Sequence, residues 1–214
     1  MPMLTRLGGA LLTTAAVAAM AGLSAGPAFA GPAAKAGTWT VTPGGSVTGT
    51  VGTTIFKDAT TGTTLICTSS QATGTLQSGS GLGNPLGMIQ TLSFTNCTGP
   101  LGISFSASTT GPFPLNATSY NSTNGVTVGK ITAIHGAISG PLCSATVDGT
   151  SATANDGTVK ARYKNSTGKL KVVTTGGNLH IYNVSGCFGL VNSGDTATFS
   201  GVYAISPKQA ISSP

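Results

Sequence analysis

Apolar residues alternate with Thr, Ser or Gly in one short run after another from residue 38 onward. A period of two residues is typical of strands that bury one face and expose the other. Clusters of Gly, Pro, Asn, Asp and Ser separate the runs and predict turns. The runs are TWTVT (38–42), SVTGTVGTTIF (46–56), TLSF (91–94), GISFSAS (102–108), VTVGKITAI (126–134), NLHIYNV (178–184) and DTATFSGVYAI (195–205). The pattern predicts an all-β fold, an antiparallel β-sandwich or barrel of about ten strands.

The segment VKARYKNSTGKLKVV, residues 159–173, predicts a β-hairpin with its turn at NSTG. In this register the apolar face pairs Tyr163 with Leu170 and Ala161 with Val172. The opposite face carries five basic residues, Lys160, Arg162, Lys164, Lys169 and Lys171.

This set of basic residues has two interpretations, because like charges directly across a strand pair repel and lower stability. In the first, the lysines mark a solvated sheet edge and stop it from pairing with another chain. In the second, the face binds polyanions such as wall phosphates or acidic glycans, with nucleic acid the less expected partner.

The first thirty residues read as an export signal. Arg6 precedes an apolar run over residues 7–23, and the segment ends on Ala28-Phe29-Ala30, an A-x-A cleavage motif. A membrane anchor is the alternative, but Gly and Thr dilute the run and no basic stop-transfer flank follows. The sequence has no twin-arginine pair and no lipid-bearing Cys after the run, so the general secretion pathway is expected. The mature protein is predicted to be secreted or loosely envelope-associated, without a membrane span.

The mature chain is predicted to form a single β-domain over residues 39–207. A flexible leader, residues 31–38, precedes this domain, and a C-terminal tail, residues 208–214, follows it. Only 7% of all residues are charged, Glu is absent, and the mean hydropathy is +0.25. Disorder needs low hydrophobicity together with high net charge, so the chain is expected to fold. Trp39 is expected to cap one end of the core, although it could also stack on a sugar.

Four cysteines in an exported chain predict two disulfides. Metal binding would need a CxxC motif or nearby His ligands, and the cysteine spacing provides neither. No metal site and no cofactor are therefore expected. The entropy of loop closure does not choose among the three possible connectivities, because it changes only slowly with loop length.

Local similarity between the cysteine motifs favours one of the three disulfide connectivities. Cys97 in FTNCTG and Cys187 in VSGCFG follow the same order: hydrophobic, Ser or Thr, small polar, Cys, any residue, Gly. Cys67 and Cys143 each follow a Leu within two positions. This recurrence predicts two related halves with the disulfides Cys67–Cys97 and Cys143–Cys187; the alternative links like positions across the halves. The halves would be about residues 39–123 and 124–207.

Catalytic groups are scarce. Hydrolysis usually needs paired carboxylates, a nucleophile with a base, or a metal. The four acids, Asp58, Asp148, Asp156 and Asp195, lie in or beside turns, where Asx-turn roles explain them. His135 and His180 fall within predicted strands, and no catalytic sequence motif is present. No catalytic residue is therefore predicted, and a dispersed triad would need one histidine beside an Asp and a Ser.

The Ala-rich signal, the low charge and the Gly- and Thr-rich strands resemble small secreted proteins of the high-GC Gram-positive, actinobacterial type. This resemblance is one of style over the whole chain and includes no diagnostic motif. It implies an extracellular or envelope location and assigns no functional residue.

Three functions remain open on the sequence. The leading hypothesis is a secreted, non-enzymatic structural or binding module of the cell surface, whose basic hairpin contacts anionic wall or extracellular polymers. The second is a β-barrel that carries a small apolar ligand in its interior. The third is a secreted hydrolase with a dispersed triad. An apolar cavity inside the fold would favour the second hypothesis.

Overall fold

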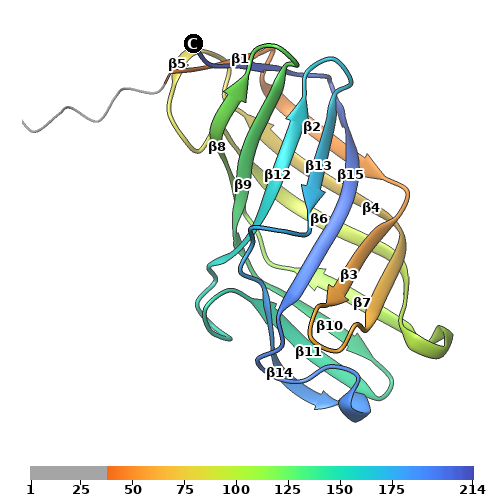
Figure 1. Ribbon diagram of the computed structural model, residues 1–214. Helices are drawn as coiled ribbons and strands as arrows, with labels where there is room; N and C mark the ends of the chain where they lie inside the picture. The colour runs from red at the N-terminus through yellow and green to blue at the C-terminus, as the bar shows by residue number, and fades with distance from the viewer. Residues whose placement is uncertain (1–37) are drawn as a thin grey trace, which may run out of the picture. The chain divides into compact units, whose positions relative to one another are not determined.

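The computed structural model describes residues 38–214, so the predicted signal peptide, with Ala28 and Ala30, and most of the leader lie outside the described residues. The described chain is all-β, as the alternating pattern predicts (Figure 1). Its strands are β1 (Trp39–Thr42), β2 (Gly45–Val51), β3 (Thr54–Asp58), β4 (Thr64–Leu76), β5 (Gly79–Leu82), β6 (Gly87–Thr98), β7 (Ser104–Thr109), β8 (Phe113–Asn121), β9 (Val126–Ile134), β10 (Gly136–Gly140), β11 (Cys143–Asp148), β12 (Gly157–Lys164), β13 (Lys169–Val173), β14 (His180–Gly186), β15 (Ala197–Ser206) and β16 (Ala210–Ser212). Two short 3₁₀ segments, η1 (Pro100–Gly102) and η2 (Cys187–Gly189), complete the fold.

Eight strands form a closed antiparallel barrel in the order β2-β4-β6-β8-β9-β12-β13-β15. Pairing between β15 and β2 and between β4 and β6 completes the ring. The alternation of side chains follows the barrel wall, so that Val159, Ala161 and Tyr163 of β12 are buried while Arg162 and Lys164 are exposed. Closure satisfies the backbone hydrogen bonds that an open sheet would leave at its edges.

Five further strands extend the wall at one end, called here the lower end. β3 continues the line of β2 and pairs with β15 and β4. Next to β6, the strands β7, β10, β11 and β14 pair in that order. A bridge between His180 and Thr196 connects this group back to the start of β15. The single run predicted over residues 46–56 is thus interrupted at Gly52 and Thr53, between β2 and β3.

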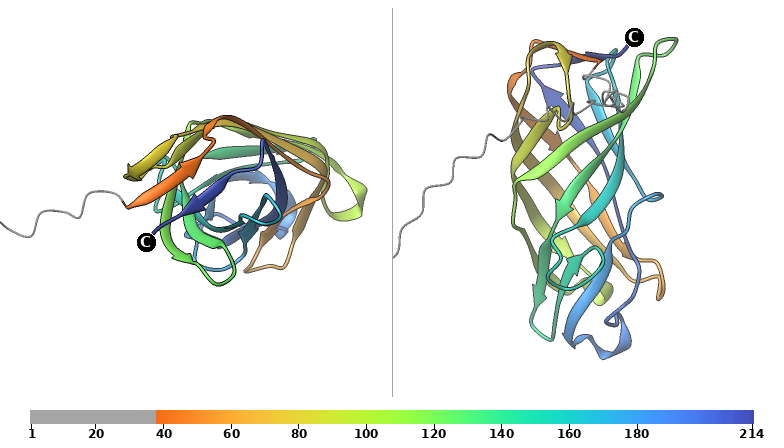
Figure 2. Two further views of the ribbon diagram at one scale, coloured as in Figure 1. Left: turned by 90° about the horizontal axis from the view of Figure 1, so that it is seen from above. Right: turned by 90° about the vertical axis from the view of Figure 1, so that its left-hand side faces the viewer.

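A separate sheet of β16, β1 and β5 lies across the opposite, upper end and is called here the cap (Figure 2, left). Trp39, Val41 and Ile211 of the cap are buried and pack together, which confirms that Trp39 caps the core.

The prediction of a C-terminal tail over residues 208–214 is wrong, because this segment contains β16. This segment has a defined structure because it is buried. Gln209 is only 2% exposed, and the hydroxyl of Tyr163 forms hydrogen bonds with the backbone N–H and C=O of Gln209, at 2.9 and 2.8 Å.

The hairpin and strand predictions can be compared directly with the structure. The β12–β13 register is the predicted one, with Tyr163 opposite Leu170 and Lys164 opposite Lys169. β9 has the predicted bounds, Val126–Ile134. The structure contains more strands than the ten or so expected, because polar strands such as β4 (sequence TLICTSSQATGTL) carry a weak hydrophobic signal.

Both predicted disulfides are present, Cys67–Cys97 and Cys143–Cys187. Cys67 and Cys97 are direct partners on β4 and β6. The second disulfide joins the start of β11 to η2, just beyond the end of β14. The residue before each closing cysteine has a positive φ, 48° at Asn96 and 71° at Gly186, which Asn and Gly tolerate best. The two motifs then differ, because Cys97 continues strand β6 whereas Cys187 begins η2. Duplication of the halves stays a prediction.

Replacing the first disulfide with Cys67→Ala and Cys97→Ala tests its contribution to stability. Removing a cross-link frees the unfolded chain, so we expect the free energy of unfolding to fall by about 2–4 kcal/mol. Urea denaturation of the oxidised wild type and the double variant measures this difference. Peptide mapping of the unreduced protein checks the connectivity, and peptides that link Cys67 to Cys143 would contradict it.

Candidate functional site

The barrel encloses an apolar cavity of about 210 Å³. Its wall includes residues from all eight barrel strands, from lower-end strands such as β7 and β10, and from β16 of the cap. The cavity therefore follows the barrel from the cap toward the lower end. Large apolar side chains of this wall include Phe56, Phe113, Ile131, Val159, Val172 and Leu179.

Small residues at inward-facing positions leave this space open. Ala72, Ala117 and Ala161 all lie on the cavity wall, on three different strands. A side chain that ends at Cβ does not reach the barrel axis, where Leu or Phe would fill it. The cavity thus results from small residues at strand positions whose side chains point into the barrel.

Tyr203 and Thr54 are two hydroxyl-bearing residues of the cavity wall, and Ser70 forms a hydrogen bond with the first of them. The Tyr203 hydroxyl and Ser70 Oγ are 3.0 Å apart and buried. Thr54 lies beside Tyr203, because Gly201 has no side chain: a Cβ at Gly201 would be 3.1 Å from Thr54 Cγ2 and 3.3 Å from Tyr203 Cε2. Thr54 is 1% exposed, and its hydroxyl has no hydrogen-bond partner.

A second unpaired hydroxyl lies nearer the cap. Thr127 of β9 is opposite Tyr163 of β12, and it is 5% exposed. Its Oγ1 also has no hydrogen-bond partner. Both Thr54 and Thr127 line the cavity. A buried hydroxyl without a partner costs free energy, so both residues carry a polar atom that the protein itself leaves unsatisfied.

The cavity wall carries little charge. Among the described residues that line it, only Lys130 is charged, and its side chain is exposed to solvent. Burial raises the pKa of Tyr203 to about 12, although its hydrogen bond with Ser70 acts in the opposite direction. The phenol is therefore neutral at physiological pH. This environment disfavours a buried ionic group and favours a neutral one.

His135 Nδ1 and Asp148 Oδ2 are 2.8 Å apart and form a hydrogen bond, which is an ion pair only when the imidazole is protonated. His135 lies between β9 and β10, so the prediction that it belongs to a strand is wrong. Asp148 also accepts hydrogen bonds from the backbone N–H groups of Gly149, Asn155 and Asp156. These contacts hold the loop after β11, a structural role.

His180 begins β14 and bonds the carbonyl oxygens of Gly149 and Asn178 through Nδ1, at 3.1 and 2.9 Å. The hydrogen bonds between described residues connect neither histidine to a serine. The arrangement that a dispersed triad would need is therefore not assembled at His135 or His180.

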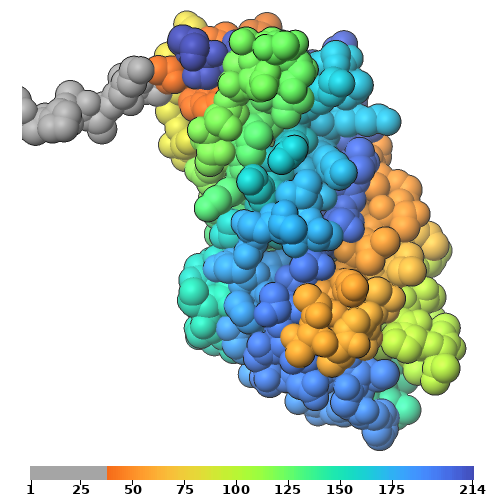
Figure 3. All heavy atoms as spheres, in the orientation of Figure 1, coloured from red at the N-terminus to blue at the C-terminus, as the bar shows by residue number. Residues whose placement is uncertain are grey.

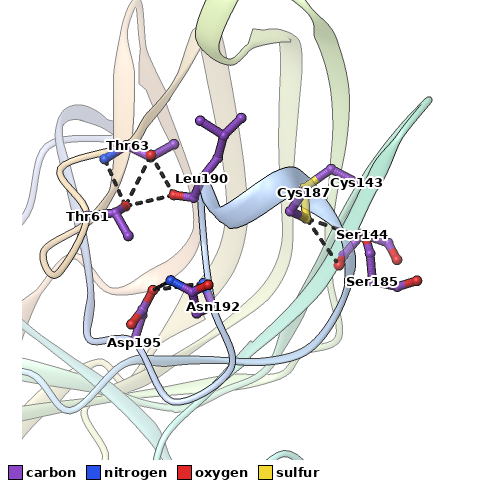
Figure 4. The surroundings of a disulfide bond; sticks show 9 residues. All are labelled: Thr61, Thr63, Cys143, Ser144, Ser185, Cys187, Leu190, Asn192 and Asp195. Atoms are coloured by element: carbon purple, nitrogen blue, oxygen red, sulfur yellow. Dashed lines mark hydrogen bonds between the residues drawn. A yellow bond between two sulfur atoms is a disulfide. The ribbon is translucent and has the colours of Figure 1, made fainter.

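The other aspartates organise loops at the lower end. Asp58 accepts from the backbone N–H groups of Thr60 and Thr61, and Asp156 accepts from Thr150. Asp195 accepts from Asn192, close to the second disulfide (Figure 4). Figure 4 also shows the hydroxyls of two threonines on the β3–β4 turn converging on the carbonyl of Leu190. These are the turn roles that the sequence predicts for the aspartates.

The predicted basic residues share one outer face of the barrel. Arg162, Lys164, Lys169 and Lys171 are exposed, and Lys160 is half-buried. Their side chains alternate with the inward-facing residues of the cavity wall. This face and the cavity are thus opposite sides of the same strands, β12 and β13.

Comparison with protein-family models, with curated proteins and with solved structures gives no match for the chain. No cluster of three or more metal-ligating side chains occurs within residues 38–214. In the same part of the chain, no helix is long and apolar enough to cross a membrane.

The sequence predicted the basic hairpin and allowed an internal cavity as one of three hypotheses, but it did not locate that cavity. A cavity depends on which small residues from distant strands face one another across the barrel. The available signal was Ala at inward-facing strand positions, for example Ala72 in β4 and Ala161 in β12. This signal identifies the residues that line the interior only once it is known which residues of each strand point into the barrel.

Asp148 makes a test by pH possible. Burial alone would raise the pKa of its carboxyl, but the hydrogen bonds from His135, Gly149, Asn155 and Asp156 hold the pKa below its ordinary value. The charged form is therefore favoured in the folded protein. This stabilisation is complete above the unfolded pKa of about 4 and is lost as the pH falls through the lower folded value.

We expect the free energy of unfolding of the wild type to decrease as the pH is lowered from about 5 to 3. Asp148→Asn removes this titration, so the variant should be less stable at pH 7 and less sensitive to acid. Urea denaturation at several pH values measures both slopes. Equal slopes for the two proteins would contradict the assignment to Asp148.

Proposed function

We propose that the protein is a secreted, non-enzymatic binding module that holds a small, neutral, largely apolar ligand inside the barrel. The observation that carries this proposal is the apolar cavity with two unpaired, buried hydroxyl groups on its wall. Well-packed interiors leave few voids larger than a water molecule, so a cavity of about 210 Å³ needs an explanation.

The volume supports a ligand of modest size. An engineered protein cavity of about 150 Å³, lined by Leu, Ile and Phe, stays dry and binds benzene. On that scale, the volume of about 210 Å³ here fits a ligand of about eight non-hydrogen atoms. Since the cavity follows the barrel from the cap toward the lower end, an extended aliphatic chain fits it better than a compact ring system.

The chemistry of the wall supports one polar, uncharged group on that chain. Thr54 and Thr127 can each donate or accept a hydrogen bond, and neither has a partner within the protein. A carboxylate in the same place would lose its hydration without gaining a counter-ion. We therefore propose a neutral ligand such as a medium-chain alcohol.

Secretion is part of the proposal, and the disulfides support it. The two disulfides fit an extracellular protein, because such bonds persist in oxidising compartments. The export signal predicted over residues 1–30 agrees with this location.

Filling the cavity tests the binding site. Ala161 is 4% exposed and lies on the cavity wall, so Ala161→Leu should occupy space that the ligand needs. We expect wild type to bind 1-heptanol saturably and the variant to bind it at least about tenfold more weakly, a loss of about 1.4 kcal/mol. Isothermal titration calorimetry at pH 7 measures both affinities, and heptanoate should bind more weakly than heptanol.

Ala204→Leu is the matched control, because Ala204 is exposed on the outer face of β15. This variant should bind heptanol as the wild type does. Thermal unfolding of the free proteins checks that both variants are folded. Lack of saturable binding by the wild type, or equal effects of the two substitutions, would reject the internal site.

The unpaired hydroxyls make an independent prediction. Thr54→Val and Thr127→Val keep the side-chain shape but remove a buried hydroxyl, so each should raise the free energy of unfolding of the ligand-free protein by about 1 kcal/mol. The variant that removes the ligand's partner should also bind heptanol about tenfold more weakly. Thr54→Ser and Thr127→Ser keep the hydroxyl and serve as controls. Unchanged heptanol affinity in both valine variants would reject the hydrogen-bonding role.

A further inference from the structure

The basic hairpin does not form a sheet edge. β12 is paired along its length with β9 on one side and with β13 on the other, and β13 is paired with β15. Lysines that block the pairing of an edge with another chain would serve no purpose in the wall of a closed barrel. Closure thus removes the first of the two interpretations of these residues.

The structure also enlarges the set of basic residues. Lys130 on β9 lies directly beside Lys160 on β12, and it is exposed. In the neighbouring pairs, Arg162 lies beside Lys171 and Lys164 lies beside Lys169. The name basic face is used below for all six residues, Lys130, Lys160, Arg162, Lys164, Lys169 and Lys171. Figure 3 views the side of the barrel on which β9, β12 and β13 lie.

No acidic side chain lies next to the basic face in the surrounding register. The flanking partners on β9 are Val126 and Val128, and those on β15 are Val202 and Ala204. None of the six side chains forms an ion pair with another described residue. The three like-charged neighbours across strands therefore repel one another without compensation, at a cost in stability.

We propose that the basic face binds a linear phosphate polymer of the extracellular or cell-wall type. Along a strand, residues of one face repeat every 6–7 Å, and adjacent strands are about 5 Å apart. The six cations thus form a regular array across three strands. One extended polyanion can neutralise several of them together, whereas a single small anion can contact only one or two.

The side chains favour phosphate recognition that does not depend on bases. Five of the six cations are lysines, which bind phosphate as point charges, and Arg162 adds a planar guanidinium that can contact two oxygens. Proteins that bind single-stranded nucleic acid combine such charges with exposed aromatic platforms. Among large exposed hydrophobic side chains of the described chain, the aromatic one is Phe188, in η2 at the lower end. The basic face has no platform of this kind.

Binding of long-chain inorganic polyphosphate over a salt series tests the proposal. The logarithm of the association constant should fall linearly with the logarithm of the salt concentration, since the contacts are ionic. Lys164→Gln, Lys169→Gln and Lys171→Gln combined should weaken binding about 100-fold at 50 mM salt and reduce the slope by about 2, as expected for three lost phosphate contacts. Thermal unfolding should show that the triple variant is at least as stable as the wild type, because repulsion is relieved.

A pair of single variants distinguishes binding at the basic face from a general effect of the protein's net charge. Lys171→Gln and Lys57→Gln remove the same charge, but Lys57 is exposed on β3, away from the basic face. Only Lys171→Gln should weaken polyphosphate binding measurably. Equal effects of the two, or unchanged affinity in the triple variant, would overturn the proposal. Tighter binding of oligothymidylate with the same number of phosphates would assign the face to nucleic acid instead.

This inference does not depend on the internal ligand. Ala161→Leu should leave polyphosphate affinity unchanged, since Ala161 faces the cavity and the basic face lies on the outside of the same strands. The two proposals can therefore fail separately.

Discussion

Closure of the sheet is the constraint on which the rest of this structure depends. Once β4 pairs with β6, every barrel strand has two neighbours, and the backbone hydrogen bonds no longer require an edge. Alternation then sends every second residue into an enclosed space. Because several of these positions hold Ala, for example Ala72 and Ala161, the interior is not filled. A closed wall and small inward residues together produce a cavity, and neither alone would do so.

The same alternation places an apolar surface on the inside of the sheet and a basic surface on its outside. On β12, the inward residues Val159, Ala161 and Tyr163 bound an apolar space, while Arg162 and Lys164 face water. The acidic residues lie elsewhere, in turns where Asp58 and Asp148 are completely buried and hold loops through hydrogen bonds. The exterior therefore keeps its positive charge uncompensated, and a low overall content of charged residues still yields a concentrated cationic surface.

Local features could be predicted from the sequence, and distant ones could not. The β12–β13 register could be predicted because one register pairs apolar residues on one face and basic residues on the other. The Cys67–Cys97 and Cys143–Cys187 pairs could be predicted from the recurring cysteine motifs. The cavity required knowledge of which small residues face one another across strands far apart in the chain. The segment from Lys208 onward was misassigned because three residues of β16 carry little periodic signal, and its burial depends on contacts with Trp39 and Tyr163.

The cap brings together strands from opposite parts of the described chain, β1 near its beginning and β16 near its end. Neither disulfide includes a residue of the cap. Removal of the last few residues by a carboxypeptidase would therefore leave the cross-linked lower end intact but would strip Ile211 from the cavity wall. Trimming of this terminus would thus expose the cavity wall beneath the cap while both covalent cross-links stay in place.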